Sequence, residues 1–545
     1  MREYVRKSDA PERSASPTIN EDEASNFLPD TMSRGKINEP TWKDTLNQVF
    51  ASCIVHCIVI QAGVNMAYST VLIGGLQANG NSTDYIDDGT IVDHITIDKD
   101  HESWIASLVT ITLPIGSLIV GPLMDKFGRK TICIALCIPT MISWILLIAS
   151  ETLAMIYAAR TVAGITAGLT SVGLVYVIEI THPRVRAMLL CLNSVFVSLG
   201  ILLTCLFALW FEWRIIAMIF LALNVGIFLA LFVVPESPYW LVCFADGFAD
   251  PERTARAERS LKWLNPRHEM YEQEYARMKE MSQSRGLNDA GGSTGSFLER
   301  SKYYAKKLRQ PIIYKPLLLL FVILLMQQLS GVYVVIFYAI SVFREIGGNF
   351  GNGFDEYAAL LLLGVIRFFM SVLTAYLSRT IGRRILCIAS GLGMAFAMFF
   401  SAMFIYLTSF CDASGDAGSS LAHQKWLLLV IVLFYVCMST LGFVVIPWTL
   451  IGELLPISFR GVGGGIMISF AYIMMFAVVK SYPYALLAIG PQNVFFFFSL
   501  MSLIGTSFVY LFLPETLGKS FKDIENYFSP LNDHDIAREK NRSKA

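Results

Sequence analysis

The sequence predicts an all-α polytopic membrane protein whose twelve transmembrane helices form two pseudo-symmetric six-helix bundles. Its composition is the first reason: 54% of the 545 residues are hydrophobic and only 16% are charged, whereas charged residues make up about 25% of a typical soluble protein. The second reason is that the apolar residues come in blocks of about 20, the length that crosses a bilayer core. The third is that charged motifs repeat between the two halves of the chain.

Composition and charge also exclude other classes of protein. Basic and acidic residues both number 43, so the chain lacks the net basic surface of a nucleic-acid-binding protein. It is too hydrophobic for an intrinsically disordered chain. Most of the ten cysteines lie inside apolar runs, and pairs such as Cys53 and Cys57 have no further ligands at the spacing of a zinc site. We therefore expect no metal and no other cofactor.

The apolar runs define the elements in order. Residues 1–47 are polar with no apolar segment of signal-peptide type, so we expect the first membrane helix to serve as its own insertion signal. Six runs precede a polar stretch at about 236–312, and six follow it. The expected spans lie near residues 48–76, 104–124, 131–150, 154–178, 188–209, 214–234, 315–343, 358–378, 385–409, 426–450, 462–486 and 494–513.

Basic residues alternate between the loops and therefore predict the orientation. Arg129 and Arg383 belong to a set of basic loops, and the loops between them are poor in Lys and Arg. Because cytoplasmic loops carry the excess of basic residues, we expect both termini to be cytoplasmic. As a separate expectation, the protein lies in the plasma membrane. The sequon at Asn81 falls in the first outer loop, where it predicts glycosylation. The expected divisions are a cytoplasmic N-terminal tail (1–47), an N-terminal bundle (48–234), a cytoplasmic linker with short helices (235–312), a C-terminal bundle (313–513) and a cytoplasmic C-terminal tail (514–545).

Three motifs occur at matching places in both halves of the chain. Such a repeat of six helices in parallel topology is a standard transporter architecture, with the substrate site near the midplane between the halves. One repeated motif could arise by chance, but three repeated motifs at matching places indicate a duplicated bundle. The pairs are Gly128-Arg129-Lys130 with Gly382-Arg383-Arg384, Glu179 and Arg186 with Glu453 and Arg460, and Pro235-Glu236-Ser237 with Pro514-Glu515-Thr516.

Charged side chains at helix ends on one membrane face have two interpretations. They can pair across neighbouring helices and hold that face closed, or they can fix the topology and anchor helix ends among lipid headgroups. Because the charges recur in both halves, we favour a latch. The residues expected to form this cytoplasmic latch are Asp125, Arg129, Glu179, Arg186, Arg383, Glu453 and Arg460.

The motifs together resemble the sugar porter family of the major facilitator superfamily, over about residues 45–528. The stretches that carry the resemblance are GPLMDKFGRK at 121–130, PESP at 235–238, QQLSG at 327–331 and PET at 514–516. SWIASL at 103–108 and the stretch from Gly63 to Ser69 look like insect facilitated trehalose transporters. The resemblance implies a facilitative transporter of sugars, trehalose or a hexose, which works by alternating access in the lipid bilayer and is not an enzyme.

In that family, polar side chains on five helices hold the sugar. The resemblance assigns Gln327 and Gln328 to the paired glutamines of helix seven, and Trp448 to the tryptophan of helix ten. An amide offers donors and an acceptor to neighbouring hydroxyls. The alternative is that the glutamines only bond one helix to another, at about 1–2 kcal/mol per bond.

At other positions the sequence departs from the family pattern. Ser194 replaces a glutamine on helix five, Tyr333 an asparagine on helix seven, and Arg367 an asparagine on helix eight. We keep all three as candidate substrate-binding residues. A guanidinium at membrane depth costs about 2.5–3.5 kcal/mol, so Arg367 either braces the bundle through backbone carbonyls or faces the cavity. These changes leave open a carrier of another polar or anionic solute, or a sugar sensor that transports nothing.

The first helix bears on energy coupling. Proton-coupled relatives carry an aspartate there, whereas residues 62–66 (AGVNM) contain no acid. Within this helix only His56 could exchange a proton near neutral pH. The sequence therefore predicts facilitated diffusion of a small solute.

Overall fold

The structure is a computed structural model in which all described secondary-structure elements are helices. Two compact units divide the chain at Asp44, and nearly all described residues belong to the second unit. The described residues are 44–81, 97–243, 250–289, 308–346, 355–378, 380–413, 425–456, 459–517, 519 and 521–528.

The N-terminal bundle contains α1 to α8, which account for the first six expected spans. Two of these spans are divided: α3 and α4 together form the third, and α5 and α6 together form the fourth. The bounds are α1 Leu46–Asn81, α2 Lys99–Phe127, α3 Arg129–Ala135, α4 Cys137–Ile148, α5 Leu153–Leu169, α6 Val172–Ile180, α7 Pro183–Phe207 and α8 Trp213–Leu231.

Three linker helices follow, and then the second bundle. The linker contains α9 Pro238–Cys243, α10 Pro251–Leu264 and α11 His268–Asp289. The C-terminal bundle and the segment after it contain α13 Pro311–Leu329, α14 Val332–Phe337, α15 Ala339–Ile346, α16 Glu356–Leu377, α17 Arg383–Ala413, α18 Lys425–Leu441, α19 Ile446–Leu454, α20 Arg460–Phe512 and α21 Phe521–Phe528.

The described residues contain eleven helical runs long and apolar enough to cross a membrane. The longest run, Val462–Phe512, holds one residue with non-helical backbone angles: Gly490 has a φ of +78° and directly precedes Pro491. Because only glycine adopts positive φ readily and proline breaks the helical hydrogen-bond ladder, this point divides the run into two spans. The prediction of twelve membrane helices is therefore confirmed.

The seventh span differs from the single helix expected at 315–343. It consists of α13, α14 and α15, with breaks at Gly331 and at Tyr338. Gly331 has a φ of +83°, and a Cβ atom there would lie 2.5 Å from the ring of Phe498. The tenth span is likewise broken, because the segment 442–445 between α18 and α19 is not α-helical and Pro447 lies in the first turn of α19.

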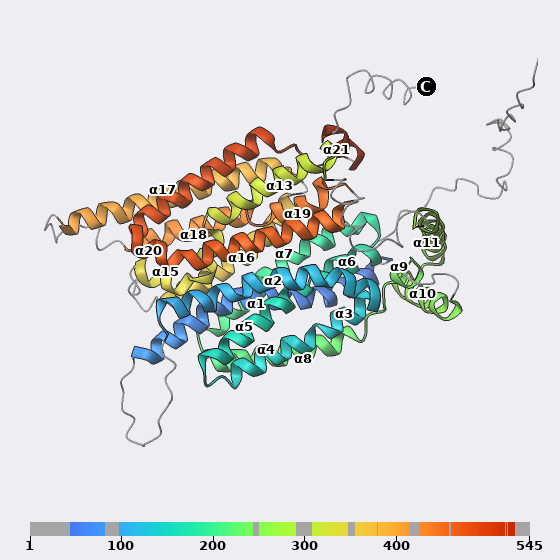
Figure 1. Cartoon of the computed structure of the whole chain (residues 1–545), viewed down its shortest axis with the longest axis horizontal. Coiled ribbons are helices and arrows are strands. Elements are labelled where there is room, and N and C mark those ends of the chain that lie inside the picture. The colour runs from blue at the N-terminus through green and yellow to red at the C-terminus, as the bar shows by residue number, and fades with distance from the viewer. Residues whose placement is uncertain are drawn as a thin grey trace, which may run out of the picture. The chain divides into compact units, whose positions relative to one another are not determined.

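The two bundles pack through four pairs of helices. Helix α2 contacts α20, α7 contacts α16, and α1 contacts α14 and α15. Figure 1 shows the helices of the first bundle in blue to green beside those of the second in yellow to red. Serine hydroxyls meet at two of these contacts: Ser117 and Ser469 lie 3.4 Å apart, and Ser198 and Ser371 lie 2.6 Å apart.

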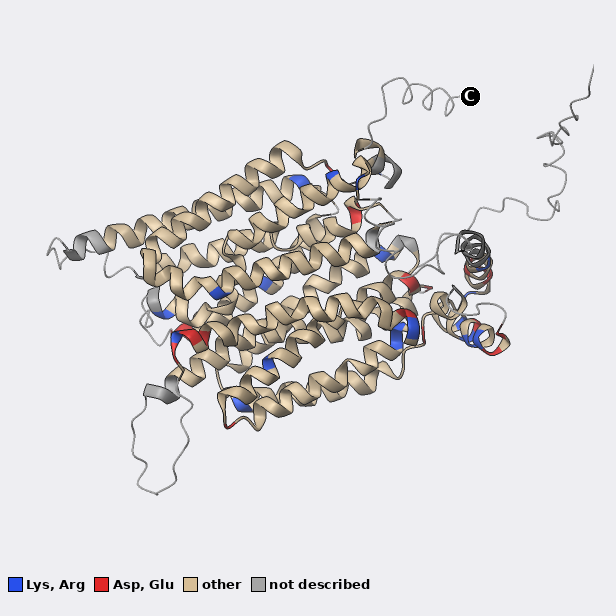
Figure 2. Cartoon of the chain, viewed as in Figure 1, with Lys and Arg blue, Asp and Glu red and all other residues tan. Residues whose placement is uncertain are grey.

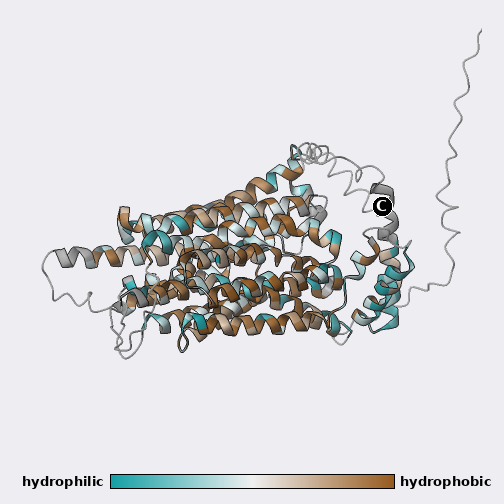
Figure 3. Ribbon diagram, turned by 60° about the horizontal axis from the view of Figure 1, so that its bottom comes forward, coloured by the Kyte–Doolittle hydropathy of each residue, from teal (hydrophilic) through white to brown (hydrophobic). Residues whose placement is uncertain are grey.

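Polarity follows the expected membrane arrangement. Hydrophobic residues dominate the helices of both bundles, whereas the linker helices α10 and α11 are hydrophilic (Figure 3). Charged residues gather toward the helix ends, with few in the middle of the bundles (Figure 2). Large apolar side chains such as Leu118, Phe369 and Leu487 are more than half exposed on the protein surface, as is normal for positions that face lipid tails.

Candidate functional site

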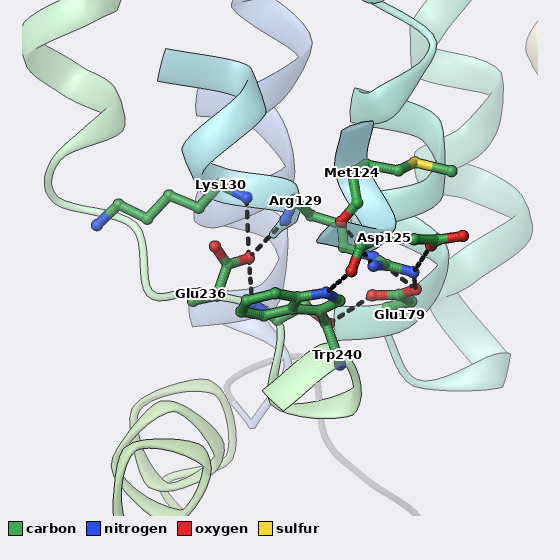
Figure 4. Close-up of polar contacts among 8 residues, drawn as sticks. Met124, Asp125, Arg129, Lys130, Glu179, Glu236 and Trp240 are labelled. Atoms are coloured by element: carbon green, nitrogen blue, oxygen red, sulfur yellow. Dashed lines mark hydrogen bonds and ion pairs between the residues drawn. The ribbon is translucent and has the colours of Figure 1, made fainter. Parts of the chain in front are cut away.

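Arg129 is the centre of an ion-pair network in the N-terminal bundle (Figure 4). Its guanidinium lies 3.1 Å from the Asp125 carboxylate and 3.0 Å from that of Glu179, and Nη1 donates to the Met124 carbonyl at 2.9 Å. Arg129 is only 2% exposed. The structure thus brings together three of the residues that the sequence assigned to the latch. We call the membrane face that carries this network and the linker helices the linker face.

Glu236 caps the helix that begins at Arg129. Its carboxylate accepts the backbone N–H groups of Arg129 at 3.0 Å and of Lys130 at 2.8 Å. The preceding residue, Gly128, has a φ of +100°, and a Cβ atom there would lie 2.6 Å from Glu236 Oε2. A carboxylate at this place satisfies N–H groups that have no partner within the helix and interacts favourably with the positive end of the helix dipole.

The linker begins on the same network. Ser237 donates its hydroxyl to Glu179 at 2.5 Å, and the indole Nε1 of Trp240 donates to the Asp125 carbonyl at 2.9 Å. These bonds attach α9 to the ends of α2 and α6. The first residues of the linker are therefore anchored to the N-terminal bundle.

The C-terminal bundle repeats this construction. Arg383 pairs with Glu453 at 2.5 Å, and Thr516 donates its hydroxyl to Glu453 at 2.9 Å. Glu515 accepts the backbone N–H groups of Arg383 at 3.0 Å and of Arg384 at 3.2 Å. The motifs that the sequence repeats thus form equivalent three-dimensional networks in the two halves.

Five of the latch charges pair within their own bundle: Asp125, Arg129, Glu179, Arg383 and Glu453. Between two described residues, no ion pair at the linker face joins the N-terminal to the C-terminal bundle. Arg186 donates to the Thr181 carbonyl at 2.8 Å, on the loop that precedes α7. Arg460 begins α20, but its side chain lies outside the described residues, as does that of Asn81 together with the rest of the sequon.

An ion pair joins the bundles at the opposite face. Lys480 of α20 lies 2.9 Å from the Asp100 carboxylate of α2, and the hydroxyl of Tyr484 also bonds to Asp100. The Lys480 ammonium group lies 4.1 Å from the centre of the Trp104 ring. The chain offers no local sequence signal for this pair, because the two charged residues are 380 positions apart.

Further bonds at the opposite face involve α1, α2 and α15. Glu102 of α2 accepts from the Gln77 amide of α1 and from the Ser341 hydroxyl of α15, both at 3.2 Å. Arg344 of α15 donates to Gln77 at 2.9 Å and pairs with Glu356 at 3.3 Å. The bundles are therefore closed against each other here. We call the contacts of Asp100 and Lys480 and those of Glu102 with its partners the opposite-face network.

Thr70 of α1 occupies the break between α14 and α15. Its hydroxyl lies 2.8 Å from the Phe337 carbonyl and accepts the Ala339 N–H at 3.0 Å. A side chain of one bundle thus satisfies backbone groups that the break in the other bundle leaves without helical partners.

At mid-depth, the two adjacent glutamines of α13 have different surroundings. Gln327 donates from Nε2 to the Phe443 carbonyl at 2.7 Å and to the Val444 carbonyl at 3.1 Å, at the break between α18 and α19. Gln328 is 1% exposed, and neither its Nε2 nor its Oε1 has a hydrogen-bond partner among the described residues. One glutamine therefore braces the broken helix, while the other has its full hydrogen-bonding capacity available.

Aromatic side chains from three helices meet at the same level of the C-terminal bundle. Trp448 of α19 donates its indole N–H to the Tyr333 hydroxyl at 3.1 Å, and its ring lies 5.3 Å from that of Tyr472 on α20. Such a group offers flat apolar faces next to hydroxyl groups, which suits the two sides of a sugar ring.

Arg367 lies inside the protein and has no anionic partner among the described residues. It is 4% exposed, its Nε has no hydrogen-bond partner among the described residues, and it lies close enough to Tyr333 and Cys205 to interact with them electrostatically. No backbone carbonyl within the described part accepts a hydrogen bond from it, which argues against the bracing interpretation. Ser194 is half-buried on α7, one turn before the Ser198 that contacts Ser371 of α16.

Two buried basic residues of the N-terminal bundle have structural partners. His56 has its Nε2 at 2.9 Å from the Leu189 carbonyl of α7. Arg160 donates to the Asn65 carbonyl at 3.0 Å and to the Ile105 carbonyl at 3.4 Å. In the described ranges, no group of three or more His, Cys, Asp or Glu side chains could hold a metal ion.

Comparison with known proteins identifies the relatives of this chain. The family model described as "Sugar (and other) transporter" matches residues 55–528. The facilitated trehalose transporter Tret1-2 homolog of Drosophila sechellia is 28% identical over 482 residues, with 88% of this chain and 91% of the relative covered. Tret1 of Culex quinquefasciatus is 28% identical over 488 residues, covering 89% and 87%.

Solved structures share the fold. The proton:xylose symporter XylE bound to a bromodeoxyglucose superimposes with a TM-score of 0.66 at 18% identity, covering 89% of this chain and all of that chain. An inward-open structure of XylE from E. coli gives a TM-score of 0.64 at 18% identity, covering 87% and 98%. The fold of this chain is therefore that of the major facilitator superfamily.

Proposed function

The chain belongs to the sugar transporter family, and from that premise we propose that it carries trehalose or a hexose across the membrane by facilitated diffusion. Its relatives named as facilitated trehalose transporters align over nearly nine-tenths of both chains, which favours this function over a sensor or a carrier of anionic solutes. The absence of an acidic residue at 62–66 of the first helix supports transport without proton coupling.

The observation that carries the proposal is the free hydrogen-bonding capacity of Gln328 at membrane depth. A buried amide without a partner costs about 1–3 kcal/mol, a cost that a ligand with several hydroxyl groups would remove. Trp448 and Tyr333, 3.1 Å apart through their hydrogen bond, would supply the flat apolar surface for the ring. We assign Arg367 of α16 and Ser194 of α7, two helices that pack against each other, to the same binding site.

The distribution of contacts supports alternating access. The bundles are joined by the opposite-face network, whereas the ion pairs of the linker face lie within each bundle. We infer that this structure is closed on the opposite face, and that its linker-face networks keep each bundle rigid as the two bundles move.

We further propose that the linker face is cytoplasmic and that the protein lies in the plasma membrane. The excess of Lys and Arg on loops of the linker face supports this orientation. Both termini and the linker at 235–312 would then be cytoplasmic, and Asn81 would be glycosylated on the outer side. The bundles would extend over residues 48–234 and 313–513.

Counterflow in proteoliposomes tests the proposed function. Vesicles preloaded with unlabelled trehalose or glucose should accumulate the labelled sugar, while vesicles with Gln328→Leu protein should accumulate less at equal protein content. A pH gradient should not drive uptake. If the wild-type protein gives no more exchange than empty vesicles for any sugar of the panel, the function is another one.

A further inference from the structure

A basic pocket lies where the linker meets the N-terminal bundle, outside the site described above. Its volume is about 450 Å³, and α3, α9, α10 and the end of α8 line it. Three cationic side chains face it: Lys130 of α3 and Arg256 and Arg259 of α10. In Figure 4, the Lys130 side chain points away from the Arg129–Glu179 pair. We call it the linker pocket.

These cations have no carboxylate partner in the described part of the chain. Lys130 donates to the Phe232 carbonyl at 3.0 Å, and Arg259 donates only to Ala255 in its own helix at 3.3 Å. Arg256 is exposed and makes no hydrogen bond or ion pair with another described residue. Lys130 and Arg256 lie close enough to repel each other. Glu236 attracts Lys130, but no described carboxylate pairs with the two arginines, and an anion would reduce the repulsion among the three cations.

One carboxylate also lines the linker pocket, but its oxygens are already used. Glu236 accepts the backbone N–H groups of Arg129, Lys130 and Ser237 through Oε1, and Oε2 accepts that of Thr131 at 3.4 Å. This carboxylate keeps its negative charge while it caps the N-terminus of α3, but the pocket lining sets three cations against it. The linker pocket keeps a net positive charge.

The other walls indicate what kind of anion fits. Ile134 and Phe232 provide apolar surface, and the hydroxyls of Thr131 and Ser260 provide further donors. Phe232 is 55% exposed and its neighbour Val233 is 60% exposed, so the end of α8 presents apolar groups beside the cations. A ligand that uses both surfaces must carry an anionic group with acceptor oxygens and an apolar part.

We propose that the linker pocket binds the phosphorylated headgroup of an anionic membrane lipid. This inference rests on the proposed orientation, which places the pocket at the anionic cytoplasmic leaflet. Basic pockets at the cytoplasmic ends of transmembrane helices are suited to such headgroups, and arginine binds phosphate through paired N–H donors. A bound headgroup ties α10 to the ends of α3 and α8, and so couples the linker to the N-terminal bundle.

Titration of the full-length protein in phosphatidylcholine nanodiscs tests the proposal. The probe is dioctanoyl phosphatidylinositol 4,5-bisphosphate, and dissociation constants are measured for wild type and for Arg256→Gln/Arg259→Gln. Losing two cations should weaken binding about 30-fold, or about 2 kcal/mol at about 1 kcal/mol for each cation. The matched control is Lys262→Gln/Lys279→Gln, which removes the same charge from exposed positions of α10 and α11 outside the linker pocket. It should bind as wild type does.

Three outcomes overturn the proposal. The first is equal affinity of the wild type and the Arg256/Arg259 variant, and the second is an equal loss in the control variant. The third is that inorganic phosphate protects the protein from thermal unfolding as strongly as the lipid at the same concentration, which would identify a free anion as the ligand. If the double variant does not fold, Arg256→Gln alone should weaken binding about fivefold. Sugar counterflow can be measured in phosphatidylcholine vesicles, which contain no anionic lipid. A negative result for lipid binding therefore does not affect the proposed transport function.

Discussion

Substituting the two adjacent glutamines of α13 should have opposite consequences. Gln327→Leu removes the amide that donates to the Phe443 and Val444 carbonyls at 2.7 and 3.1 Å. A buried acceptor left without its donor costs about 1–3 kcal/mol. We therefore expect Gln327→Leu to lower the melting temperature in detergent by several degrees, because the break between α18 and α19 loses its support.

Gln328→Leu should leave the melting temperature unchanged or raise it. The side chain is 1% exposed and its amide atoms have no partner among the described residues, so a leucine of similar size removes a desolvation cost without breaking a bond. If Gln328 binds the sugar, each lost hydrogen bond costs about 0.5–1.5 kcal/mol, and the dissociation constant should rise about 2- to 13-fold.

The assay measures both quantities on the same preparations. Thermal unfolding in detergent gives stability, and counterflow at several sugar concentrations gives the apparent affinity. Each variant is the control for the other, because the two substitutions are chemically identical and lie at adjacent positions of one helix. The reasoning fails if Gln328→Leu destabilises the protein as much as Gln327→Leu does, or if Gln328→Leu transports with wild-type affinity.

The other predictions concern the two faces and the buried guanidinium. Lys480→Gln and Asp100→Asn should each increase thiol labelling of Cys205, which lies near Arg367, from the opposite face. The double variant should be labelled no faster than either single variant; unchanged labelling contradicts this. Glu236→Ala and Glu515→Ala should each lower the melting temperature, because removing a helix cap costs about 0.5–2 kcal/mol; equal melting temperatures contradict it. Arg367→Asn should raise neutral sugar uptake without loss of stability, since a buried unpaired charge disappears; a stability change with an unaltered solute profile contradicts it.

The membrane helices could be predicted from sequence because the bilayer imposes a local rule. Every span needs about 20 apolar residues, and this requirement is satisfied by each segment on its own. The repeated motifs were equally accessible: Arg129 and Glu179 in one half match Arg383 and Glu453 in the other, and the structure brings each pair within 3.0 Å. Because the motif occurs in both halves, the sequence predicted the same network at two places.

What the sequence could not show depends on contacts between distant segments. Gln327 and Gln328 are identical and adjacent, and only the position of the α18–α19 break decides which of them is already bonded. The break at Gly331 depends on the ring of Phe498, which occupies the place of a Cβ atom. The pairing of Lys480 with Asp100 follows no spacing rule, since it exists only once the bundles are assembled.

The burial of the two kinds of ion pair differs in the way that alternating access requires. Within the N-terminal bundle, the Arg129 side chain is 3% exposed and that of Glu179 is 10% exposed. Between the bundles, Lys480 is 20% exposed and Asp100 is 56% exposed. Breaking a buried pair leaves a charge without compensation, whereas an exposed pair exchanges its partner for water at little cost. The Arg129–Glu179 pair is therefore suited to survive the conformational change, whereas the Lys480–Asp100 pair can break during it; the Arg383–Glu453 pair, with side chains 19% and 23% exposed, lies between them. We propose that the networks repeated in the sequence keep each half rigid, and that the contacts that are not repeated open and close the path between the halves.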